Sequence, residues 1–330
     1  MINCGIIGFG KMGKIRAKAI EASGLGCVSY IYDIDAKKNL DYNFVDLPKH
    51  ILEDPKIDAI FVCTPNYLIP GYCIDALKAG KHVFSEKPPG FNSKEVSSII
   101  KVEKNTPNLK LMFGFNHRHH ASMLLIKKII VSGELGKLLW IRGRYGKEVD
   151  QTFFDGWRAK KELAGGGILL DQGIHMVDLM LDLVGDFDQV HAFVSNLYWK
   201  IDGIEDNVFA IFRNSSNGIC ASLHSTMTQW RYLFSFEVFL EGGALILNGL
   251  KTSSGSYGDE VLTIKRNNSH LEGGKLKAEE QIIYHTDNSW LAEVNYFFGA
   301  ILNNQSIHIG NSQDAYNLMR IIDDIYKNGK

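Results

Sequence analysis

The chain has 330 residues, of which 45% are hydrophobic and 22% are charged. These fractions are ordinary for a globular protein, and the length favours two domains over one. The 36 Lys and Arg residues against 37 Asp and Glu residues leave a net charge of −1, without the basic excess of nucleic-acid-binding proteins. No apolar run approaches the roughly 20 residues of a membrane helix.

No signal-peptide pattern opens the chain, so we expect a cytoplasmic protein. From the balanced charge and the short apolar runs we expect no nucleic-acid partner and no membrane partner. The five cysteines form no CxxC pair. A disulfide framework or a zinc site is therefore not expected, and we predict no metal.

Strand-like and helix-like segments alternate over the first part of the chain. Short apolar runs predict buried parallel strands, and the stretches between them have helical character. This alternation indicates βαβ units, and we assign a doubly wound Rossmann domain to residues 1–116. The predicted strands are 2–7, 28–32, 59–63, 82–85 and 110–115, and the predicted helices are 12–23, 48–53, 68–79 and 93–103.

The pattern changes after residue 116, where strands become longer and follow one another. We predict an α+β domain over residues 117–330 with an open, mostly antiparallel sheet and helices on one face. The last predicted helix could pack back on the first domain. The predicted strands are 138–145, 189–194, 207–212, 219–227, 234–240, 244–247 and 260–265, and the predicted helices are 121–132, 168–184, 290–302 and 314–326.

A glycine-rich turn follows the first predicted strand and opens the first predicted helix. It fits G-x-G-x-x-G, in which the glycines allow a tight turn, close approach of backbone to a pyrophosphate and close helix–strand packing. Unpaired N–H groups at the helix start would face the phosphates. The alternative is a strand–turn–helix that binds no ligand. The turn consists of Gly8, Phe9, Gly10, Lys11, Met12 and Gly13.

Asp33 ends the second predicted strand, 20 residues after Gly13. A carboxylate there suits the ribose hydroxyls of NAD and would repel the 2′-phosphate of NADP. Lys37 and Lys38 follow closely and could approach such a phosphate. The sequence therefore favours NAD over NADP without excluding NADP.

Five motifs in order resemble the Gfo/Idh/MocA family, named for glucose–fructose oxidoreductase, inositol dehydrogenase and a rhizopine catabolism protein. The resemblance runs from residue 2 to about residue 185 in register and more loosely beyond. The motifs are TPN at 64–66, GKHVFSEKP at 80–88, GFNHR at 114–118, WR at 157–158 and GGGILLDQGIHMVD at 165–178.

The resemblance implies a Rossmann domain followed by a domain whose open sheet often forms an oligomer interface, so we expect a homodimer or homotetramer. It implies that the Lys87–Pro88 peptide is cis, beside the nicotinamide. It adds Thr64, Pro65, Asn66, Glu86 and Lys87 to the expected cofactor contacts.

Carried over from the family, the groups that surround the reacting carbon are Lys87, Asp171 and His175. The chemistry agrees, because hydride leaves an alcohol carbon only as a base takes the hydroxyl proton, and histidine titrates in the right range. Asp171 precedes His175 by four residues, which places both on one helix face.

Other interpretations of that helix remain. Asp171, His175, Asp178 and Asp182 form a polar stripe opposite an apolar one, which is also the pattern of a solvated face. The spacing of Asp171, His175 and Asp178 would also allow a metal site, although the chemistry of the resembled family uses none.

For the substrate we expect contacts from Asn116, Arg118, Trp157 and Arg158. An aromatic face suits a sugar ring and an arginine suits an anionic group, but packing is an equal alternative for Trp157 and Arg158. One of His117, His119 and His120 could also touch substrate, although surface or helix-start histidines are commoner.

The sequence thus predicts an NAD(P)-dependent oxidoreductase that acts on a secondary alcohol of a sugar, polyol or sugar derivative, with a carbohydrate-like small molecule as its partner. The alternative is a dinucleotide-sensing regulatory or binding protein. The presence of Lys87, Asp171 and His175 argues against it, since a sensor does not need proton-transfer groups.

Overall fold

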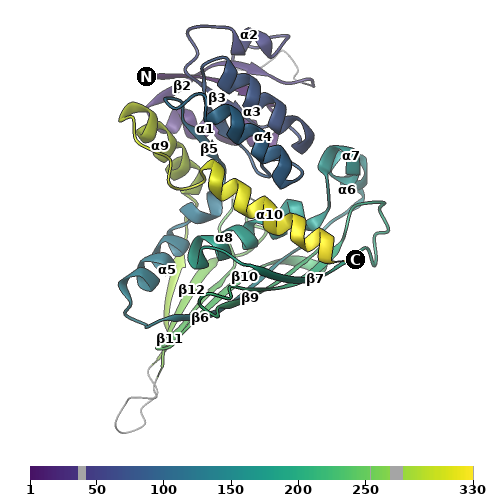
Figure 1. Ribbon diagram of the computed structural model, residues 1–330, viewed down its shortest axis with the longest axis vertical. Coiled ribbons are helices and arrows are strands. Elements are labelled where there is room, and N and C mark those ends of the chain that lie inside the picture. The colour runs from purple at the N-terminus through teal and green to yellow at the C-terminus, as the bar shows by residue number, and fades with distance from the viewer. Residues whose placement is uncertain (36–41, 253, 268–277, 330) are drawn as a thin grey trace. The chain divides into compact units, whose positions relative to one another are not determined.

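The computed structural model describes residues 1–35, 42–252, 254–267 and 278–329, and Figure 1 traces its elements. The residues group into two compact units. Unit 1 comprises Met1–Asn116, Glu162–Gly165 and Ser289–Arg320, and unit 2 comprises His117–Lys161, Gly166–Asn288 and Ile321–Lys330. The segment Ser289–Arg320, which the sequence assigned to the second domain, thus groups with the first. Among the described helices none is long and apolar enough to cross a membrane.

Unit 1 is built on a five-stranded parallel sheet with the strand order β2-β1-β3-β4-β5. The chain reverses its direction of winding between β1 and β3, and ligands of such sheets bind at this switch point, beyond the carboxyl ends of the strands. The strands are β1 (Ile2–Ile7), β2 (Gly26–Tyr32), β3 (Ala59–Val62), β4 (His82–Ser85) and β5 (Leu111–Phe113).

The helices of unit 1 follow the expected alternation, which confirms the Rossmann prediction. Helix α4 agrees with the prediction at both ends, and α1 to α3 differ from the predicted bounds by one residue at each end. They are α1 (Lys11–Ala22), α2 (Lys49–Leu52), α3 (Ile69–Lys78) and α4 (Ser93–Glu103). A further helix of unit 1, α9 (Ser289–Leu302), comes from the part of the chain that the sequence assigned to the second domain.

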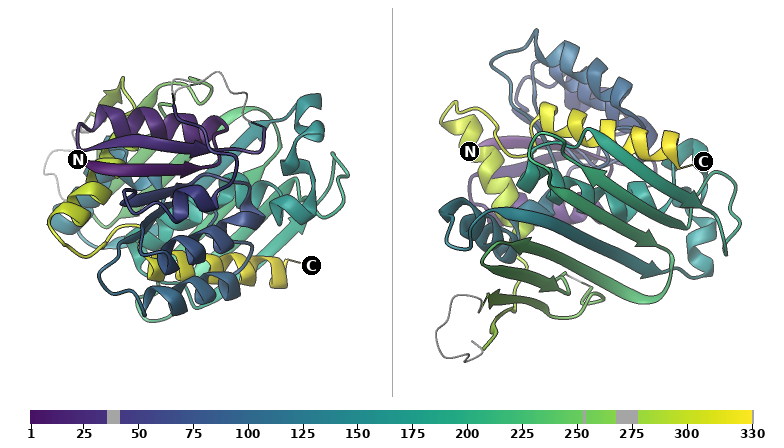
Figure 2. Two further views of the ribbon diagram at one scale, coloured as in Figure 1. Left: turned by 90° about the horizontal axis from the view of Figure 1, so that it is seen from above. Right: turned by 60° about the horizontal axis from the view of Figure 1, so that its bottom comes forward.

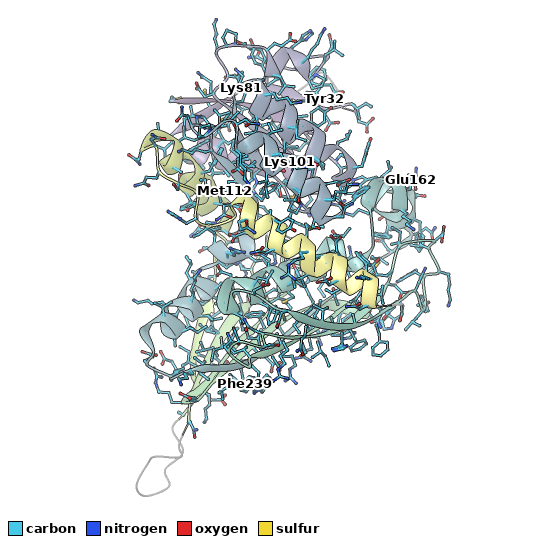
Figure 3. The ribbon with its side chains drawn as sticks, in the orientation of Figure 1. Tyr32, Lys81, Lys101, Met112, Glu162 and Phe239 are labelled. Atoms are coloured by element: carbon cyan, nitrogen blue, oxygen red, sulfur yellow. The ribbon has the colours of Figure 1, made fainter. Side chains whose placement is uncertain are left out.

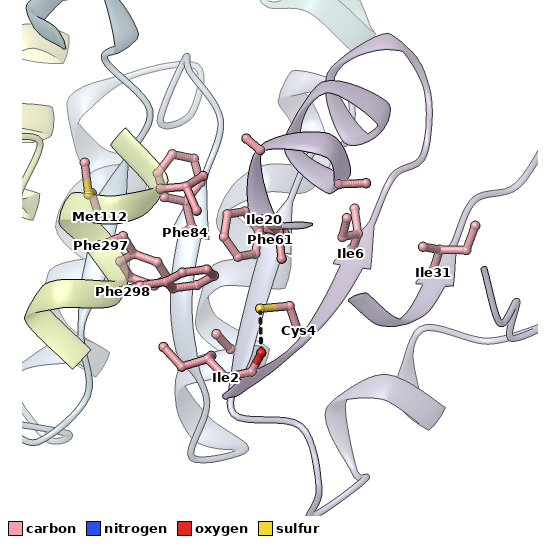
Figure 4. Packing of buried hydrophobic residues seen from close by; sticks show 14 of the residues in the cluster. Ile2, Cys4, Ile6, Ile20, Ile31, Phe61, Phe84, Met112, Phe297 and Phe298 are labelled. Carbon is pink, nitrogen blue, oxygen red and sulfur yellow. Dashed lines mark hydrogen bonds between the residues drawn. The ribbon is translucent and has the colours of Figure 1, made fainter. Parts of the chain in front are cut away.

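Four phenylalanine rings form the centre of the unit 1 core (Figure 4). Phe61 of β3 stacks on Phe84 of β4 with ring centroids 5.0 Å apart. Phe297 and Phe298 of α9 meet Phe61 edge to face at 5.8 and 6.0 Å. Offset and edge-to-face pairs suit the charge distribution of aromatic rings. Helix α9 is therefore a part of the Rossmann core, although it lies more than 170 residues beyond β5 in the chain.

Unit 2 contains an eight-stranded sheet with the order β13-β12-β11-β10-β6-β9-β8-β7, in which the β6–β9 pair is parallel and the other pairs are antiparallel. The broad sheet is seen in the right-hand view of Figure 2. This confirms the predicted mostly antiparallel sheet. The strands are β6 (Leu138–Glu148), β7 (Gln189–Ser195), β8 (Asn207–Arg213), β9 (Cys220–Thr226), β10 (Thr228–Leu240), β11 (Gly243–Asn248), β12 (Glu260–Arg266) and β13 (Glu280–Tyr284).

One face of this sheet is covered by helix α8 (Ile174–Val184). A Cβ at Gly143 of β6 would lie 2.7 Å from the Cε of Met180 and 3.1 Å from the Sδ of Met176. The glycine thus lets the helix approach the strand closely. The remaining helices of two or more turns are α5 (Ala121–Ser132), which the sequence placed correctly, and α10 (Ser312–Asn328), whose residues divide between the two units.

Several elements after residue 116 differ from the sequence prediction. Strand β13 was not predicted, and neither were the short helices α6 (Gln151–Asp155) and α7 (Lys161–Ala164). The predicted helix 168–184 begins instead with a π-helical turn at Leu169–Gly173. Strand β6 continues three residues beyond its predicted end at 145.

Replacing the buried ring of Phe297 tests whether α9 stabilises unit 1. Phe297→Ala is expected to lower the free energy of unfolding by about 3–5 kcal/mol because it removes a ring from a packed aromatic cluster. Leu302→Ala, at an exposed position of the same helix, is the control and should change it by less than about 1 kcal/mol. Urea unfolding measures both. Equal effects of the two variants would contradict this assignment of α9 to the core.

Candidate functional site

The loop between β1 and α1 contains the three glycines of the predicted dinucleotide site. Gly8 has a φ of 94°, and a Cβ there would lie 2.5 Å from the carbonyl oxygen of Cys63. A Cβ at Gly13 would lie 2.2 Å from the carbonyl oxygen of Gly8. The fold of the loop itself therefore requires these two glycines. Gly10 differs. Apart from its neighbours in the chain, no described atom lies within 4 Å of the position that a Cβ would take there.

The open space at Gly10 lies where helix α1 begins. Gly10 is the N-cap residue, and no side chain in the described part of the molecule caps this helix. N–H groups of the first turn remain available for an anion. The Oγ1 of Thr64, just beyond β3, is buried and has no hydrogen-bond partner among the described residues. Backbone donors, open space and an unsatisfied hydroxyl at the switch point of the sheet fit the pyrophosphate and ribose of NAD.

Asp33 lies beyond the end of β2 and holds the glycine loop. Its Oδ2 accepts a hydrogen bond from the backbone N–H of Phe9 at 2.5 Å, and its Oδ1 accepts one from Asp35 at 2.9 Å. Each carboxylate oxygen has further lone pairs, so ribose hydroxyls can still bind there. Lys37 and Lys38, the candidates for a 2′-phosphate contact, lie outside the described residues.

The structure gives Glu86 a buried partner, Arg16 of helix α1. The Nε of Arg16 donates to Oε1 of Glu86 at 2.5 Å, and its NH1 lies 2.6 Å from Oε2 of Glu293 on α9. The rings of Phe84 and Trp290 lie 4.3 and 4.7 Å from the guanidinium. Burial alone lowers the pKa of Arg16, but the carboxylates of Glu293 and Glu86 raise it above its ordinary value. Glu86 is therefore part of an internal ion cluster, and we no longer assign it to the cofactor.

Lys87 follows this cluster directly, at a half-buried position just past β4. The peptide bond between Lys87 and Pro88 is cis, as the family resemblance predicted. Asn66 and Asn116, two other expected ligand contacts, are buried. The amide of Asn66 donates to the carbonyl oxygen of Ala164 at 2.8 Å, and that of Asn116 donates to Oγ of Ser289 at 3.4 Å.

The polar stripe on the helical segment that contains Asp171 and His175 is not a solvated face. Asp178 is 1% exposed and His175 is 6% exposed. Asp171 lies in the π-helical turn and His175 in the first turn of α8. Single π-helical turns inside helices are rare and occur often at functional sites. The solvated-face interpretation is therefore wrong.

Asp171 is held between two cations. Its Oδ2 accepts a hydrogen bond from Nζ of Lys147 on β6, and its Oδ1 lies 3.5 Å from Nε of Arg158. The guanidinium of Arg158 also stacks over the ring of Trp157, at 4.4 Å from the ring centre. Opposite charges at this distance favour the ionised form of a carboxyl group. Trp157 and Arg158 thus adjoin the predicted catalytic aspartate, and half of the Arg158 side chain remains exposed.

His175 stacks on His117, with ring centroids 3.8 Å apart and planes at 17°. The Nε2 of His117 lies 3.2 Å from the hydroxyl of Tyr145, which also bonds to Tyr257. Burial raises the pKa of Tyr145 well above its ordinary value, so this hydroxyl stays protonated. The predicted base, His175, is therefore packed against a second histidine, and that histidine contacts a pair of hydrogen-bonded tyrosines.

Arg118 has a different environment from the one predicted. It is buried, its Nε and NH2 donate to both oxygens of Asp178 at 2.6 to 3.1 Å, and its NH1 lies 3.3 Å from Asp182. A guanidinium used in this way anchors helix α8 to the segment before α5. We therefore remove Arg118 from the substrate contacts.

The three neighbouring histidines are buried, so the expectation of surface positions is wrong, whereas His120, the N-cap residue of α5, has the helix-start position that was the other alternative. His120 bonds through Nδ1 to Oε2 of Glu260 at 2.9 Å. Burial raises the pKa of Glu260, but the bonds from His120 and Ser122 lower it below its ordinary value overall. Of the three, His117 stacks on His175. In the described part of the chain no group of three His, Cys, Asp or Glu side chains could hold a metal ion.

The sequence analysis missed Tyr145, Lys147 and Tyr257. Lys147 could have been found, because residues two apart in a strand share one face and Lys147 would then lie beside Tyr145. It was missed because the predicted strand ended at residue 145. Tyr257 lies in a loop between β11 and β12, where no periodicity can place a side chain.

Comparison with known proteins supports both units independently. Residues 2–115 match the family model GFO_IDH_MocA, described as an oxidoreductase family with an NAD-binding Rossmann fold, and residues 123–246 match the GFO/IDH/MocA C-terminal domain. The chain belongs to the Gfo/Idh/MocA family. Unit 1 therefore contains the NAD-binding Rossmann fold of this family.

Named relatives in the family are enzymes of carbohydrates and polyols. Levoglucosan dehydrogenase of Pseudarthrobacter phenanthrenivorans is 31% identical over 59% of this chain, an alignment that spans only 54% of that protein. Myo-inositol 2-dehydrogenase of Thermotoga maritima is 27% identical over an alignment that covers 78% of this chain and 78% of that protein. A solved structure of levoglucosan dehydrogenase with NADH and levoglucosan superposes with a TM-score of 0.87 at 24% identity, covering 99% of this chain and 97% of that one. This last comparison supports the fold.

Adding a methyl group at two glycines separates cofactor binding from folding. Gly10→Ala is expected to weaken NADH binding at least tenfold with little loss of thermal stability, because its Cβ fills the space kept for the pyrophosphate. Gly13→Ala is the counterpart and should destabilise the protein, because its Cβ collides with the backbone of Gly8. NADH fluorescence titration and thermal melts measure these effects. NADPH, titrated alongside, should bind more weakly than NADH because Asp33 repels a 2′-phosphate. Normal NADH affinity of Gly10→Ala, or tighter binding of NADPH, would contradict this assignment.

Proposed function

We propose that this protein is an NAD-dependent dehydrogenase that oxidises a secondary alcohol of a sugar, polyol or sugar derivative, or reduces the corresponding ketone. The observation that carries the proposal is the buried His175 with the partly buried Asp171 on the same helical segment, in a chain whose other unit has the NAD-binding fold of an oxidoreductase family. A protein that only sensed the dinucleotide would not need to bury a histidine beside a carboxylate that is paired with two cations.

The nicotinamide ring of NAD supplies a hydride acceptor when it is bound. The chain must then remove the hydroxyl proton of the alcohol. We assign this step to His175, because the other candidates beside it are poorly suited. Asp171 is held as an anion by Lys147 and Arg158, and a carboxylate paired with two cations is a weak base. The hydroxyl of Tyr145 has a raised pKa and does not ionise at neutral pH.

We propose that the remaining residues orient the alcohol. Lys87 would hold its oxygen and stabilise the negative charge that develops there. Trp157 and Arg158 would meet the rest of the substrate, since an aromatic face suits a sugar ring and the half-exposed guanidinium suits its hydroxyl or anionic groups. Levoglucosan, myo-inositol and D-glucosides are named as substrates of relatives, which supports a carbohydrate-like substrate here.

Removing His175 or Lys87 tests the proposed chemistry. His175→Ala and Lys87→Ala are expected to lower kcat by at least about a hundredfold, since a positioned acid or base contributes on the order of 10² to 10⁴ in rate. NADH affinity should change little, because the pyrophosphate and ribose groups bind elsewhere in unit 1. A panel of sugars and polyols with NAD, followed by NADH absorbance, first identifies a substrate. Turnover and NADH affinity are then measured on the same preparations.

His50→Ala, at an exposed position of α2, is the control and should keep full turnover. Near-normal turnover of either active-site variant would remove that residue from the mechanism. Tight NADH binding by the wild-type protein without turnover on any alcohol of the panel would favour the dinucleotide-sensing alternative.

We also propose that the chain forms a homodimer or homotetramer through the face of the eight-stranded sheet opposite α8. Large apolar side chains alternate outward from β7 and β8, with Phe193 76% and Ile211 60% exposed. On β10, Phe239, labelled in Figure 3, stacks on Trp140 of β6 on the same face. Exposed apolar surface of this extent is typical of an interaction site. The proposed cytoplasmic location stays a prediction from the sequence.

A charge placed on this face tests the assembly. Ile211→Asp is expected to shift the protein from an oligomer toward monomer at micromolar concentration, because it would bury an unpaired carboxylate in the interface. Val131→Asp, at a position of helix α5 that is 78% exposed, is the control and should leave the mass unchanged. Light scattering coupled to size-exclusion chromatography gives the masses. A wild-type protein that is already monomeric would contradict the proposal.

A further inference from the structure

The carboxylate of Glu205 lies buried beneath the start of the helical segment that contains Asp171 and His175. Glu205 is 5% exposed and precedes strand β8. It is distant in sequence from the segment that it supports and plays no part in the chemistry proposed above. Burial of an acidic side chain is unfavourable unless its oxygens are fully hydrogen-bonded, so its partners indicate what it does.

Glu205 accepts hydrogen bonds from three successive backbone N–H groups. Its Oε2 accepts from Gly167 at 2.7 Å, its backbone carbonyl from Ile168 at 3.0 Å, and its Oε1 from Leu169 at 2.9 Å. These are first-turn donors that a helix cannot satisfy internally. Ile168, the N-cap residue of the π-helical turn, makes no capping bond with its own side chain. Glu205 therefore caps this segment from a different part of the chain.

The glycines at 166 and 167 are required by this contact. A Cβ at Gly167 would lie 2.1 Å from the carbonyl oxygen of Glu205, and a Cβ at Gly166 would lie 2.1 Å from the hydroxyl of Tyr326. The same hydroxyl donates to Oε1 of Glu205 at 2.9 Å. Two glycines of the GGG motif thus admit a carboxylate and a phenol where any side chain would exclude them.

The anchored residues lead directly into the predicted site. Leu169 begins the π-helical turn, and Asp171 lies two residues further on. The N–H of Asp171 donates to the carbonyl oxygen of Gly167 at 3.1 Å, so Asp171 is one hydrogen bond away from a residue that Glu205 holds. His175 follows in the next turn. A displacement at Gly167 would therefore pass to both groups.

We propose that Glu205 is a positioning residue for the reaction: it fixes the start of the helical segment so that Asp171 and His175 keep the geometry needed for proton transfer. This inference rests on the proposed function, because it assigns the reaction to those two residues. Tyr326 assists as a neutral donor, and burial raises the pKa of its hydroxyl well above its ordinary value.

The charge of Glu205 is a part of the argument. Burial raises the pKa of Glu205 above its ordinary value overall, although the N–H groups of Leu169 and Gly167 and the hydroxyl of Tyr326 lower it in part. An ionised carboxylate accepts all three bonds, and such charge-assisted bonds are stronger than neutral ones. An amide cannot replace it, because an NH2 group would face one of the N–H donors.

Glu205→Gln is the test, and its neighbour Asp206 provides a matched control. Asp206 is also fully buried and accepts three backbone N–H bonds, from Leu197, Tyr198 and Trp199, but it caps a loop without candidate catalytic residues. Glu205→Gln is expected to lower kcat about tenfold to a hundredfold, since small misplacements of reacting groups have effects of this order. KM and NADH affinity should change by less than about threefold. Asp206→Asn should keep kcat within about threefold of the wild type.

Hydrogen–deuterium exchange gives a readout that does not depend on turnover. Peptides that cover residues 165–175 should exchange faster in Glu205→Gln, and those that cover 196–203 should exchange faster in Asp206→Asn. Unchanged exchange at 165–175 would overturn the anchoring role even if no substrate were found. A kcat of Glu205→Gln equal to that of Asp206→Asn would overturn the positioning role.

Two further variants complete the test. If Glu205→Gln does not accumulate as folded protein, Glu205→Asp replaces it, because it keeps the charge on a side chain too short to reach both N–H groups. The same fall in kcat is expected, and a kcat within threefold of the wild type would overturn the proposal. His175→Ala is assayed alongside: full turnover of this variant would show that the proposed chemistry, and not the anchor, is at fault.

Discussion

The burial of a single guanidinium, that of Arg16, organises the unit that binds the dinucleotide. Arg16 belongs to the helix that the glycine loop opens, and its two carboxylate partners come from the segment after β4 and from α9. Removing one partner of a buried ion pair typically costs about 3–5 kcal/mol, because the other charge is left without compensation. Residues as distant in the chain as 16 and 293 are thereby held together around the phenylalanine core.

This cluster also connects the cofactor loop to the candidate lysine. Gly13 and Arg16 share helix α1, and Glu86 precedes Lys87 directly. A shift of the helix toward or away from the sheet would therefore move the phosphate-binding turn and the EKP segment together. Unit 2 uses the same physical principle with other groups, since Arg118 holds Asp178 of α8 and Glu205 holds the backbone that leads to it.

The sequence predicted most elements of the fold because its apolar periodicities are strong. Strands at 2–7 and 82–85 and helices at 93–103 and 121–132 agree with the structure at both ends. Strand β13 was missed because it is short and its apolar residues follow one another, so that it has no alternation of apolar and polar positions. The π-helical turn was missed because one extra residue in a turn leaves the apolar stripe of a helix nearly unchanged.

For the site, the sequence could name residues but could not assign their partners. Glycine spacing and the offset of Asp33 describe a local motif, so the dinucleotide loop was predictable. Arg118 and Glu86 were predicted to meet ligands, yet each pairs with an acid or base that lies 60 or 70 residues away. Such pairing depends on the tertiary fold. A charged residue in a motif therefore need not contact the ligand. It can instead hold other parts of the site in place through an ion pair.

The buried charges of this protein are better explained by orientation than by stability. Replacing a buried ion pair with well-packed apolar groups is often neutral or stabilising, so stability alone gives little reason to bury Glu86, Asp178 and Glu205. What these three share is their position: each lies within a few residues of a predicted catalytic group or hydrogen-bonds to the segment that contains one. A carboxylate with several fixed donors permits one geometry, whereas an apolar contact tolerates sliding. Proton transfer depends on distances of a few tenths of an ångström, and this dependence accounts for the placement of the charged anchors.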